Sequence, residues 1–332
     1  MYLVAGTQAD QPKNNEIQIM KLSQLHKTRK TRDQVDNGDS DSDSDDENVD
    51  EDPLLEHRSL PTNGGTNRIR VHQSSSGIVA ASWSEIGKVH IWNLQPAYTS
   101  LSQPGAGGDT AAEKPIYSVK THRDEGYGLA FSSDGSLLSG DNRGKIFLTQ
   151  PTSSHYTTSP LGFSSHSSHS VEDIQWSPSE KSVFASVSSS GELHINDIRT
   201  PDRSKAVLNI KASEVDVNVL SWNTAISYLA VTGDDNGATK VWDLRQIQKV
   251  EKGKDATVAE FSWHKGAVTS VHWCPAESSV FASSGADEQV CLWDLSTEAD
   301  DEEQPSASGD MKDIPQQLLF IHQVISILEC DS

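Results

Sequence analysis

A histidine, a serine and an aspartate near the end of the chain have the side chains that a hydrolase would use. His264, Ser283 and Asp287 are of the types in which a serine attacks a carbonyl group while the histidine accepts its proton. Ser283 lacks the Gly-x-Ser-x-Gly turn that exposes such a nucleophile, and similar sets recur in part elsewhere in the chain. We therefore expect a structural role: together with Trp293, these residues would form hydrogen bonds that tie a loop to a strand.

Three histidines in a serine-rich stretch give a second chemical signal, a metal site. His155, His166 and His169 supply imidazole groups, which zinc prefers, but a polar loop has the same composition. Neither a Gly-x-Gly-x-x-Gly nor a phosphate-binding P-loop pattern occurs. The three cysteines follow no metal-site or disulfide spacing. The sequence thus predicts no metal, no cofactor and no enzymatic activity.

A short phrase that ends in Trp-Asp, or a near variant, recurs along the chain. Residues 89–94 read Val-His-Ile-Trp-Asn-Leu, and the pattern returns at 239–244 and 290–295. Seven of the eight tryptophans occupy two equivalent places in five similar units, which span residues 67–94, 122–150, 169–199, 214–245 and 264–295. Such repeats are typical of four-stranded sheets that stack around an axis. We expect the tryptophan near the end of a unit to pack between neighbouring sheets and to donate its indole N–H, as Trp92, Trp242 and Trp293 would.

The chain is strongly acidic, with a formal net charge of -21 over 332 residues. Residues 36–52 hold ten carboxylates and no lysine or arginine. This segment cannot bury apolar surface against its own repulsion and is predicted to be disordered. The acidic arm that it forms includes Asp41, Asp43, Asp45, Asp46 and Glu47. Such a charge balance favours basic protein partners over specific nucleic-acid binding, and no apolar run is long enough to cross a membrane.

Serines alternate with acids inside this arm. Ser40, Ser42 and Ser44 each have an acidic residue three positions later, a spacing that suits an acidophilic kinase of the casein kinase II type. Each phosphate would add about -1.5 to -2 units of charge; an unmodified, solvated linker is the alternative. The basic cluster from Lys27 to Arg32 is consistent with either a nuclear localisation signal or a solvated strand end.

The Trp-Asp endings resemble those of the WD-repeat family, whose members fold as β-propellers. Residues 2–8, the acidic insertion after them and residues 67–71 are similar to the branch of the histone-binding WD-repeat proteins. Residues 170–178 and 317–323 are similar to the glutamate-rich WD-repeat proteins within that branch. The resemblance implies a nuclear and nucleolar chaperone for a basic ribosomal protein in large-subunit assembly, which also binds histones and chromatin.

The same resemblance predicts an all-β propeller of the seven-bladed type, with about six blades present and the seventh incomplete. We expect first-blade strands at 1–35, an acidic disordered insertion at 36–63, blades at 64–296, an acidic loop at 297–313 and the start of the last blade at 314–332. Relatives have a segment before the first strand and a complete seventh blade. The chain is therefore expected to be truncated at both ends.

Loops on one face of the expected propeller are predominantly acidic. Loops that enter a first strand and turns that join a second strand to a third lie on the same face, which predicts a surface for basic clients. The candidate client-binding residues are Asp124, Glu125, Tyr127, Glu172, Asp173, Glu214, Asp216 and Asp234. One aspartate per turn commonly holds the turn itself, a role we assign to Asp141, Asp235 and Asp287. A solvated rim is the alternative for the others.

Residues 242–245 suggest a second function. Trp242, Asp243 and Arg245 resemble the WD-x-Arg box that docks some WD-repeat proteins on the adaptor of a cullin–RING ubiquitin ligase, and residues 196–199 are a weaker copy. The resemblance implies a substrate receptor of such a ligase as the alternative function. Arginine also occurs at this place in WD repeats that have no ligase role.

Overall fold

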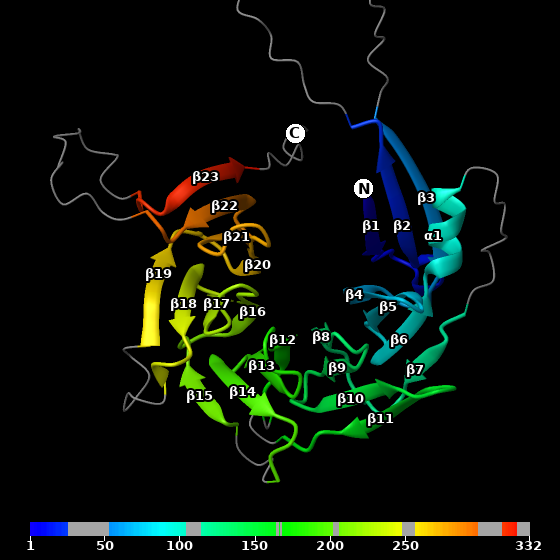
Figure 1. Cartoon of the computed structure of the whole chain (residues 1–332), viewed down its shortest axis with the longest axis horizontal. Helices are drawn as coiled ribbons and strands as arrows, with labels where there is room; N and C mark the ends of the chain where they lie inside the picture. Colours follow the sequence, from blue (N-terminus) through cyan, green and yellow to red (C-terminus); the bar gives the residue numbers. More distant parts are fainter. Residues whose placement is uncertain are drawn as a thin grey trace, which may run out of the picture.

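Six antiparallel sheets follow one another around a central axis (Figure 1). The computed structural model describes residues 1–25, 53–103, 114–163, 166, 168–201, 206–247, 256–297 and 314–323. Each sheet is built from strands that are consecutive in the chain, and in the four-stranded sheets the first strand lies nearest the axis. The prediction of an all-β propeller with about six blades is confirmed. A seventh sheet is not among the described residues.

The strands of the six sheets have the following bounds. The first sheet holds β1 (Tyr2–Gly6), β2 (Glu16–Ser23) and β3 (Leu54–Pro61), with a short 3-10 helix at Pro12–Asn14. The second holds β4 (Thr66–Ser74), β5 (Gly77–Ser84), β6 (Lys88–Asn93) and β7 (Tyr117–Val119), and the third holds β8 (Gly128–Phe131), β9 (Leu137–Gly140), β10 (Ile146–Pro151) and β11 (Tyr156–Pro160). The fourth holds β12 (Val171–Trp176), β13 (Val183–Ser188), β14 (Glu192–Asp197) and β15 (Leu208–Lys211). The fifth holds β16 (Val217–Trp222), β17 (Leu229–Asp234), β18 (Ala238–Asp243) and β19 (Thr257–Ser262), and the sixth holds β20 (Val268–Trp273), β21 (Val280–Gly285), β22 (Gln289–Asp294) and β23 (Leu318–Gln323).

Neighbouring sheets bury each other's faces. Leu193 and Ile195 of the fourth sheet share one buried cluster with Trp222 and Trp242 of the fifth. A second cluster joins the fifth sheet to the sixth, from Val231 to Trp273 and Trp293. A strand presents alternate side chains to opposite faces, so each sheet needs a neighbour on both sides to bury its apolar residues.

The tryptophans near the unit ends hold their own sheets as well. The indole N–H of Trp92 donates to the hydroxyl of Ser82, and that of Trp293 donates to the hydroxyl of Ser283, both at 2.9 Å. Trp242 makes the same 2.9 Å bond to a threonine, Thr232. The predicted packing and the predicted N–H donation are both confirmed.

Three segments differ from the sequence prediction. Residues 54–61, expected inside the disordered insertion, form β3 and pair along their whole length with β2. Residues 318–323, expected to begin a seventh blade, form β23, the fourth strand of the sixth sheet. The helix α1 (Gln95–Ser102) was not predicted; it buries Ala97 and Leu101 against the first two sheets.

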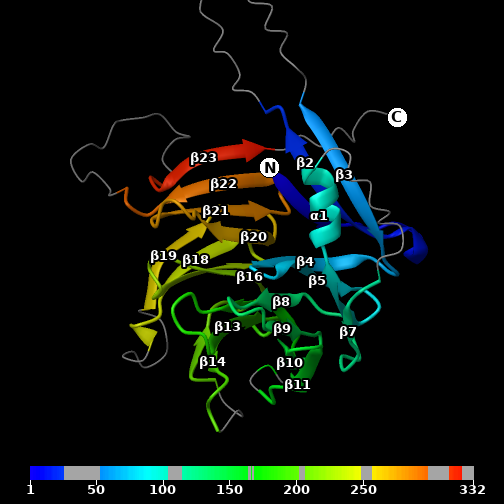
Figure 2. The same ribbon diagram turned by 45° about the vertical axis from the view of Figure 1, so that its right-hand side comes forward.

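The propeller has two rims. Loops entering the first strands meet the turns between second and third strands on the upper rim, where Asn142 donates its N–H to the carbonyl of Glu125 and Asp235 donates to that of Asp216. The remaining connections lie on the lower rim. Ser23 and Leu54, at the ends of β2 and β3, pair on the lower rim. Figure 2 shows these two strands side by side, with α1 next to them.

Candidate functional site

The serine, histidine and aspartate set is a structural network. His264 lies with Nδ1 3.0 Å from Asp287 and Nε2 2.8 Å from the hydroxyl of Ser283. That hydroxyl also accepts the indole N–H of Trp293 and is almost completely buried. A serine enclosed in this way cannot reach a substrate, so the structural interpretation of these residues is confirmed.

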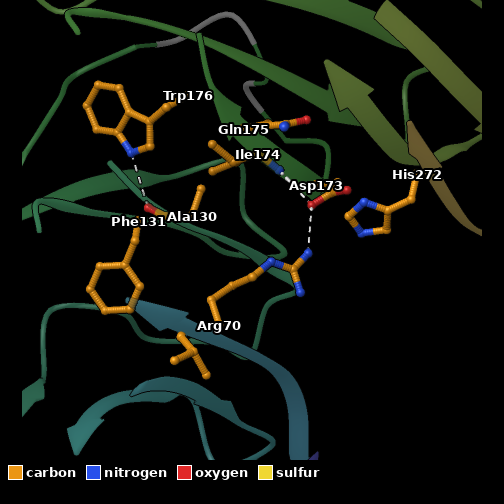
Figure 3. Close-up of a pocket in the computed structure, with 9 residues that line it drawn as sticks. Arg70, Ala130, Phe131, Asp173, Ile174, Gln175, Trp176 and His272 are labelled. Atoms are coloured by element: carbon orange, nitrogen blue, oxygen red, sulfur yellow. Dashed lines mark hydrogen bonds and ion pairs between the residues drawn. The ribbon is translucent and has the colours of Figure 1, made fainter. Parts of the chain in front are cut away.

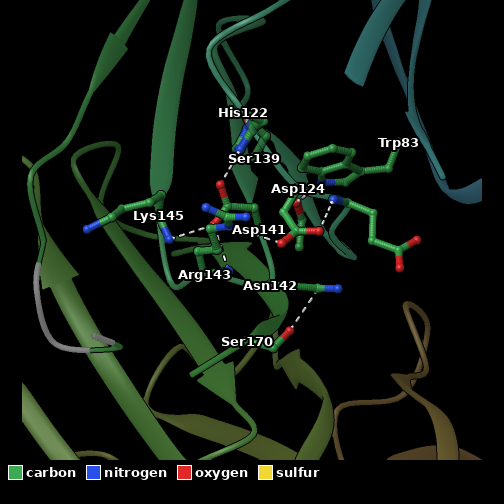
Figure 4. A network of polar contacts seen from close by, with 11 residues as sticks. Trp83, His122, Asp124, Ser139, Asp141, Asn142, Arg143, Lys145 and Ser170 are labelled. Atoms are coloured by element: carbon green, nitrogen blue, oxygen red, sulfur yellow. Dashed lines mark hydrogen bonds and ion pairs between the residues drawn. The ribbon is translucent and has the colours of Figure 1, made fainter. Parts of the chain in front are cut away.

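The third sheet repeats the network with the aspartate at a different place in the turn (Figure 4). His122 is 2.8 Å from both Asp141 and Ser139. The other carboxylate oxygen of Asp141 accepts the backbone N–H groups of Arg143 and Lys145. Asp141 therefore holds the turn between β9 and β10, as predicted.

The turn of the fifth sheet corrects the roles of two aspartates. Asp234, predicted to contact a client, is buried and accepts the backbone N–H groups of Asn236 and Ala238 and the hydroxyl of Ser213. Its carboxylate already accepts these hydrogen bonds and is buried, so the prediction that Asp234 contacts a client is wrong. Asp235, predicted to hold the turn, is instead exposed on the upper rim.

Asp173 is also enclosed. Its two carboxylate oxygens accept the backbone N–H groups of Ile174 and of Leu220 on the next sheet, and Arg70 lies 3.8 Å away. These groups border a cavity of about 240 Å³ around the axis, with His272 on another wall (Figure 3). Asp173 joins sheets inside the ring and is not available to a client on the rim, which corrects its assignment.

Three carboxylates gather on the upper rim between the fourth and fifth sheets. Burial raises the pKa of Glu172 above its ordinary value, and the negative charges of Asp216 and Asp235 raise it further, while the hydrogen bond from Ser170 and the positive charge of Arg68 lower it. Tyr127 lies beside the same group, and its pKa is raised by burial and by the charges of the neighbouring glutamates. We call Glu172, Asp216 and Asp235 the acidic cluster.

The other predicted rim residues each lie beside a polar or basic partner. Asp124 forms an ion pair with Arg143 at 3.0 Å (Figure 4), and the hydrogen bond from that arginine lowers its pKa. Glu125 accepts a hydrogen bond from Asn67 at 3.1 Å. Glu214 has a 91% exposed side chain, 3.9 Å from Lys211. The structure thus groups the residues of the acidic cluster, whereas Asp124, Glu125 and Glu214 lie apart from it. The loop sequences alone do not show this difference.

Arg199 and Arg245 have equivalent positions, two residues after the third strands of the fourth and fifth sheets. Arg245 binds the carboxylate of Asp243 through Nε and a terminal nitrogen, at 3.0 and 2.7 Å, and its guanidinium stacks on Tyr228 at 3.4 Å. Arg199 binds Asp197 in the same way. The side chains remain 56% and 67% exposed, so both guanidinium groups are fixed at the surface on the lower rim.

The fourth sheet contains an incomplete version of the polar network. His166 bonds to the hydroxyl of Ser186 at 2.7 Å, but the structure gives no hydrogen-bond partner to its Nδ1. Its ring stacks on that of His194, with 4.1 Å between ring centres. Burial lowers the pKa of His166 to about 3 and also lowers that of His194. Within the described ranges, no three or more metal-ligating side chains are grouped to hold a metal ion.

Several predicted sites lie outside the described residues. They are the arm acids Asp41, Asp43, Asp45, Asp46 and Glu47, the serines Ser40, Ser42 and Ser44, the basic cluster from Lys27 to Arg32, and most of the acidic loop at 297–313. No helix in the described part of the chain has both the length and the apolar character needed to span a membrane.

Comparison with known proteins agrees with this architecture. Residues 256–294 match the family described as WD domain, G-beta repeat. The chain is 37% identical to the protein HEAT STRESS TOLERANT DWD 1 of Arabidopsis thaliana, over 97% of this chain and 73% of the relative. The chain belongs to the WD-repeat family. It is also 45% identical to the ribosome assembly protein rrb1 of Schizosaccharomyces pombe, over 97% of this chain and 66% of that relative.

Two further relatives support the narrower resemblance. The glutamate-rich WD repeat-containing protein 1 of Dictyostelium discoideum is 42% identical over 60% of this chain and 42% of its own length. The histone acetyltransferase type B subunit 2 of Debaryomyces hansenii is more distant, at 26% identity over 77% of this chain and 58% of the relative. The predicted similarity to glutamate-rich WD-repeat proteins, and at greater distance to the histone-binding WD-repeat proteins, is confirmed.

Removing Asp141 should destabilise the protein, while removing the nearby Asp124 should not. Asp141→Ala leaves a buried histidine and two backbone N–H groups without their acceptor, which costs about 3 kcal/mol. Asp124→Ala breaks an exposed ion pair worth about 0–1 kcal/mol. Urea unfolding of both variants at pH 7 measures the difference. Equal destabilisation by the two substitutions would contradict the structural role of Asp141.

Stability should fall in mild acid because of His166. Its pKa is lowered in the folded protein from 6.5 to about 3, so between these values the unfolded chain binds a proton that the folded chain does not. Unfolding free energy should therefore decrease by about 2 kcal/mol from pH 7 to pH 5 through this residue. In His166→Gln the decrease should be smaller by that amount, whereas the exposed His155→Gln should behave like the parent in urea unfolding at both pH values.

Proposed function

We propose that this protein is a non-enzymatic scaffold and chaperone that binds basic nuclear proteins on its upper rim. The clients would be a large-subunit ribosomal protein and histones, in the nucleolus and nucleus. The acidic cluster is the observation that carries this proposal, and the similarity to a ribosome assembly protein supports it.

The acidic cluster suits a cationic client for a physical reason. Burial raises the pKa of Glu172 in the free protein, and repulsion from the negative charges of Asp216 and Asp235 raises it further. A lysine or arginine placed among them would remove this repulsion, so binding would gain more than a single exposed ion pair provides. Tyr127 beside the cluster adds an aromatic face, on which a cation can stack.

A chaperone of this kind would act by neutralising charge. A free basic ribosomal protein or histone tail binds nucleic acid non-specifically through its lysines and arginines, and the upper rim would compete for the same groups. Asp124, Glu125 and Glu214 would extend the surface around the acidic cluster. Because exposed charges are screened over about 8 Å at physiological ionic strength, the association should weaken steeply with added salt.

The acidic arm would add a second contribution, because its carboxylates can also pair with the lysines and arginines of a client. Phosphorylation of Ser40, Ser42 and Ser44 would strengthen this contact by adding negative charge. Mass spectrometry of the native protein tests the modification directly, and finding these serines bare under all conditions would exclude it.

Neutralising the acidic cluster should weaken client binding without harming the fold. In Glu172→Gln/Asp216→Asn, two charges worth about 0.5 kcal/mol each are lost, so the Kd for purified core histones should rise about five-fold. Thermal stability should be unchanged or higher, because a repulsive, partly buried charge is removed. Binding is measured by fluorescence anisotropy at 50 and 200 mM salt.

The matched control carries the same charge change on the lower rim. Glu180→Gln/Glu277→Gln removes two exposed carboxylates from turns of the fourth and sixth sheets. Its Kd should stay within two-fold of the parent value. If the two double variants weaken binding equally, the effect comes from net charge and the upper rim is not the binding surface.

A second candidate function is docking on a ubiquitin-ligase adaptor. The specific observation is the fixed pair Arg199 and Arg245, which present rigid, exposed guanidinium groups at matching places on neighbouring sheets. A preorganised guanidinium loses little side-chain entropy when it binds a carboxylate or carbonyl group. In this reading Trp242 is structural, and Asp243 acts by holding Arg245.

Substituting Arg245 separates the two functions. Arg245→Ala should abolish co-purification with the ligase adaptor if the docking function operates, and should leave histone binding unchanged. Arg143→Ala, which removes a comparably exposed arginine from the upper rim, is the control. Retained adaptor binding in an Arg199→Ala/Arg245→Ala double variant would contradict the ligase role.

A further inference from the structure

Arg70 lacks a close partner for its positive charge. Its guanidinium group reaches from the second sheet into the cavity around the axis, where the carboxylate of Asp173 lies 3.8 Å away (Figure 3). This distance is too long for a hydrogen bond. Among the residues that the structure describes, the guanidinium donates only to the carbonyl of Ile69, at 3.0 Å. Because an arginine has five N–H donors, most of the donors of Arg70 remain available to a ligand.

Asp173 compensates the charge of Arg70 only in part. Its two carboxylate oxygens already accept the backbone N–H groups of Ile174 and Leu220, at 3.0 and 3.2 Å. Burial lowers the pKa of Arg70; the negative charge of Asp173 opposes this with a smaller effect, and the positive charge of Arg68 lowers the pKa further. The side chain is still 36% exposed, so a ligand can reach it. A second anion in the cavity would therefore stabilise the charged guanidinium.

Gln175 provides a second donor on the wall of the same cavity. Its side-chain oxygen accepts the backbone N–H of Trp222 at 2.6 Å, and this bond fixes which end of the amide faces the fifth sheet. The amide nitrogen lies at the other end, and it has no hydrogen-bond acceptor among the described residues. A carboxylate in the cavity could accept hydrogen bonds from both Arg70 and Gln175, and bonds of this charged kind are the stronger ones.

A second cavity connects this site to the lower rim. It has a volume of about 290 Å³ and adjoins the first, because Phe131, Gln175 and Trp176 line both. Its other lining residues come mainly from 132–133 and 177–181, in lower-rim connections of the third and fourth sheets. Both of these sheets have a neighbour on each side in the ring. We call the two cavities together the axial passage; its size is in the range of ligand pockets, roughly 300–1,000 Å³.

The mouth of the axial passage adds a cation and apolar walls. Lys181 lines the second cavity and forms no ion pair among the described residues. The neighbouring Glu180 lies 3.8 Å from Arg199, which offsets its charge. Phe131 and Pro178 contribute apolar surface between the mouth and the axis. Cations at both ends of a partly apolar passage favour a ligand that carries carboxylates next to apolar side chains.

We propose that the axial passage binds a short acidic segment of a partner protein, whose aspartate or glutamate side chain accepts hydrogen bonds from Arg70 and Gln175. Apolar residues beside this acid lie against Phe131 and Pro178, and Lys181 attracts the segment at the lower rim. The site is separate from the acidic cluster, which is on the upper rim and suits basic proteins. The two rims thus select partners of opposite charge.

A peptide with a single carboxylate tests the proposal on the whole protein. The probe is Ser-Leu-Glu-Leu-Ser, acetylated at its N-terminus and amidated at its C-terminus, and binding is measured by titration calorimetry. It should bind saturably and should slow hydrogen exchange in residues 132–136 and 177–182. The same peptide with glutamine in place of glutamate should bind about ten-fold more weakly, because hydrogen bonds to a charged group are lost. Equal binding of the two peptides, or protection only on the upper rim, would overturn the proposal.

Two substitutions at the inner end provide the matched variants. Gln175→Glu keeps an oxygen that can accept the N–H of Trp222 but replaces the amide nitrogen by a negative charge, so at pH 8 it should weaken binding of the glutamate peptide about ten-fold. Arg70→Gln should do the same by removing the cation. Arg58→Gln is the control, since Arg58 lies on the first sheet and donates to Ser100; it should bind as the parent does. Unchanged binding in both inner variants would overturn the proposal.

An exposed variant keeps the test valid if a substitution near the axis unfolds the protein. Lys181 is exposed at the mouth, so Lys181→Gln should leave the thermal midpoint unchanged and weaken binding of the glutamate peptide about three-fold. Histone binding should be the same in Lys181→Gln as in the parent, which separates this site from the acidic cluster. Peptide binding that is unchanged in Lys181→Gln, with the protein folded, would overturn the placement of the segment in the axial passage.

Discussion

The packing of one sheet against the next is the constraint on which the rest of this structure depends. The sheets within the ring bury apolar residues on both faces, so each of them depends on its neighbours for stability in water. Tryptophans at two equivalent positions of the repeat pack into these buried faces. Those at the unit ends tie the third strand to the second, and Trp176 and Trp273 donate their indole N–H groups to the innermost strand of the preceding sheet. The ring order is therefore specified by hydrogen bonds as well as by burial.

The same constraint explains why chemically reactive side chains are inert here. His264, Ser283 and Asp287 have the identities of a catalytic set, but their hydrogen bonds are all made inside the sheet and the upper turn. The fifth sheet reaches a similar result without a histidine, since the hydroxyl of Ser213 bonds to Asp234. The fourth sheet leaves the network unfinished, with the stacked rings of His166 and His194 in place of a histidine and an acid. The residue types alone are compatible with catalysis, whereas the burial of these side chains shows that their role is structural.

Much of the fold follows from the sequence because the repeat is carried by large, periodic residues. Seven tryptophans in two places predicted the repeated sheets, the packing between them and the N–H donation by the indole groups. The wrong predictions concern segments that lack these periodic residues. Acidic segments of the sequence separate β3 and β23 from the strands that precede them in their sheets. The helix α1 lies in the connection between β6 and β7, where no helix was predicted. Asp234 and Asp235 are adjacent and identical in type, so only the turn geometry shows that Asp234 points inwards and Asp235 outwards.

Function in this architecture resides where packing imposes no requirement. The upper turns of the third and fifth sheets each bury one acceptor, Asp141 and Asp234, whereas Asp235 is exposed beside its buried neighbour. Glu172 is informative because its charge is unfavourable to the folded protein: burial and two neighbouring carboxylates oppose its ionisation. A rigid ring can hold such a group in place, since the energy lost at one rim is small compared with that of the buried tryptophan clusters. A cation that approaches the acidic cluster meets Glu172, whose charge is already unfavourable to the folded protein, so binding of the cation would relieve an existing cost.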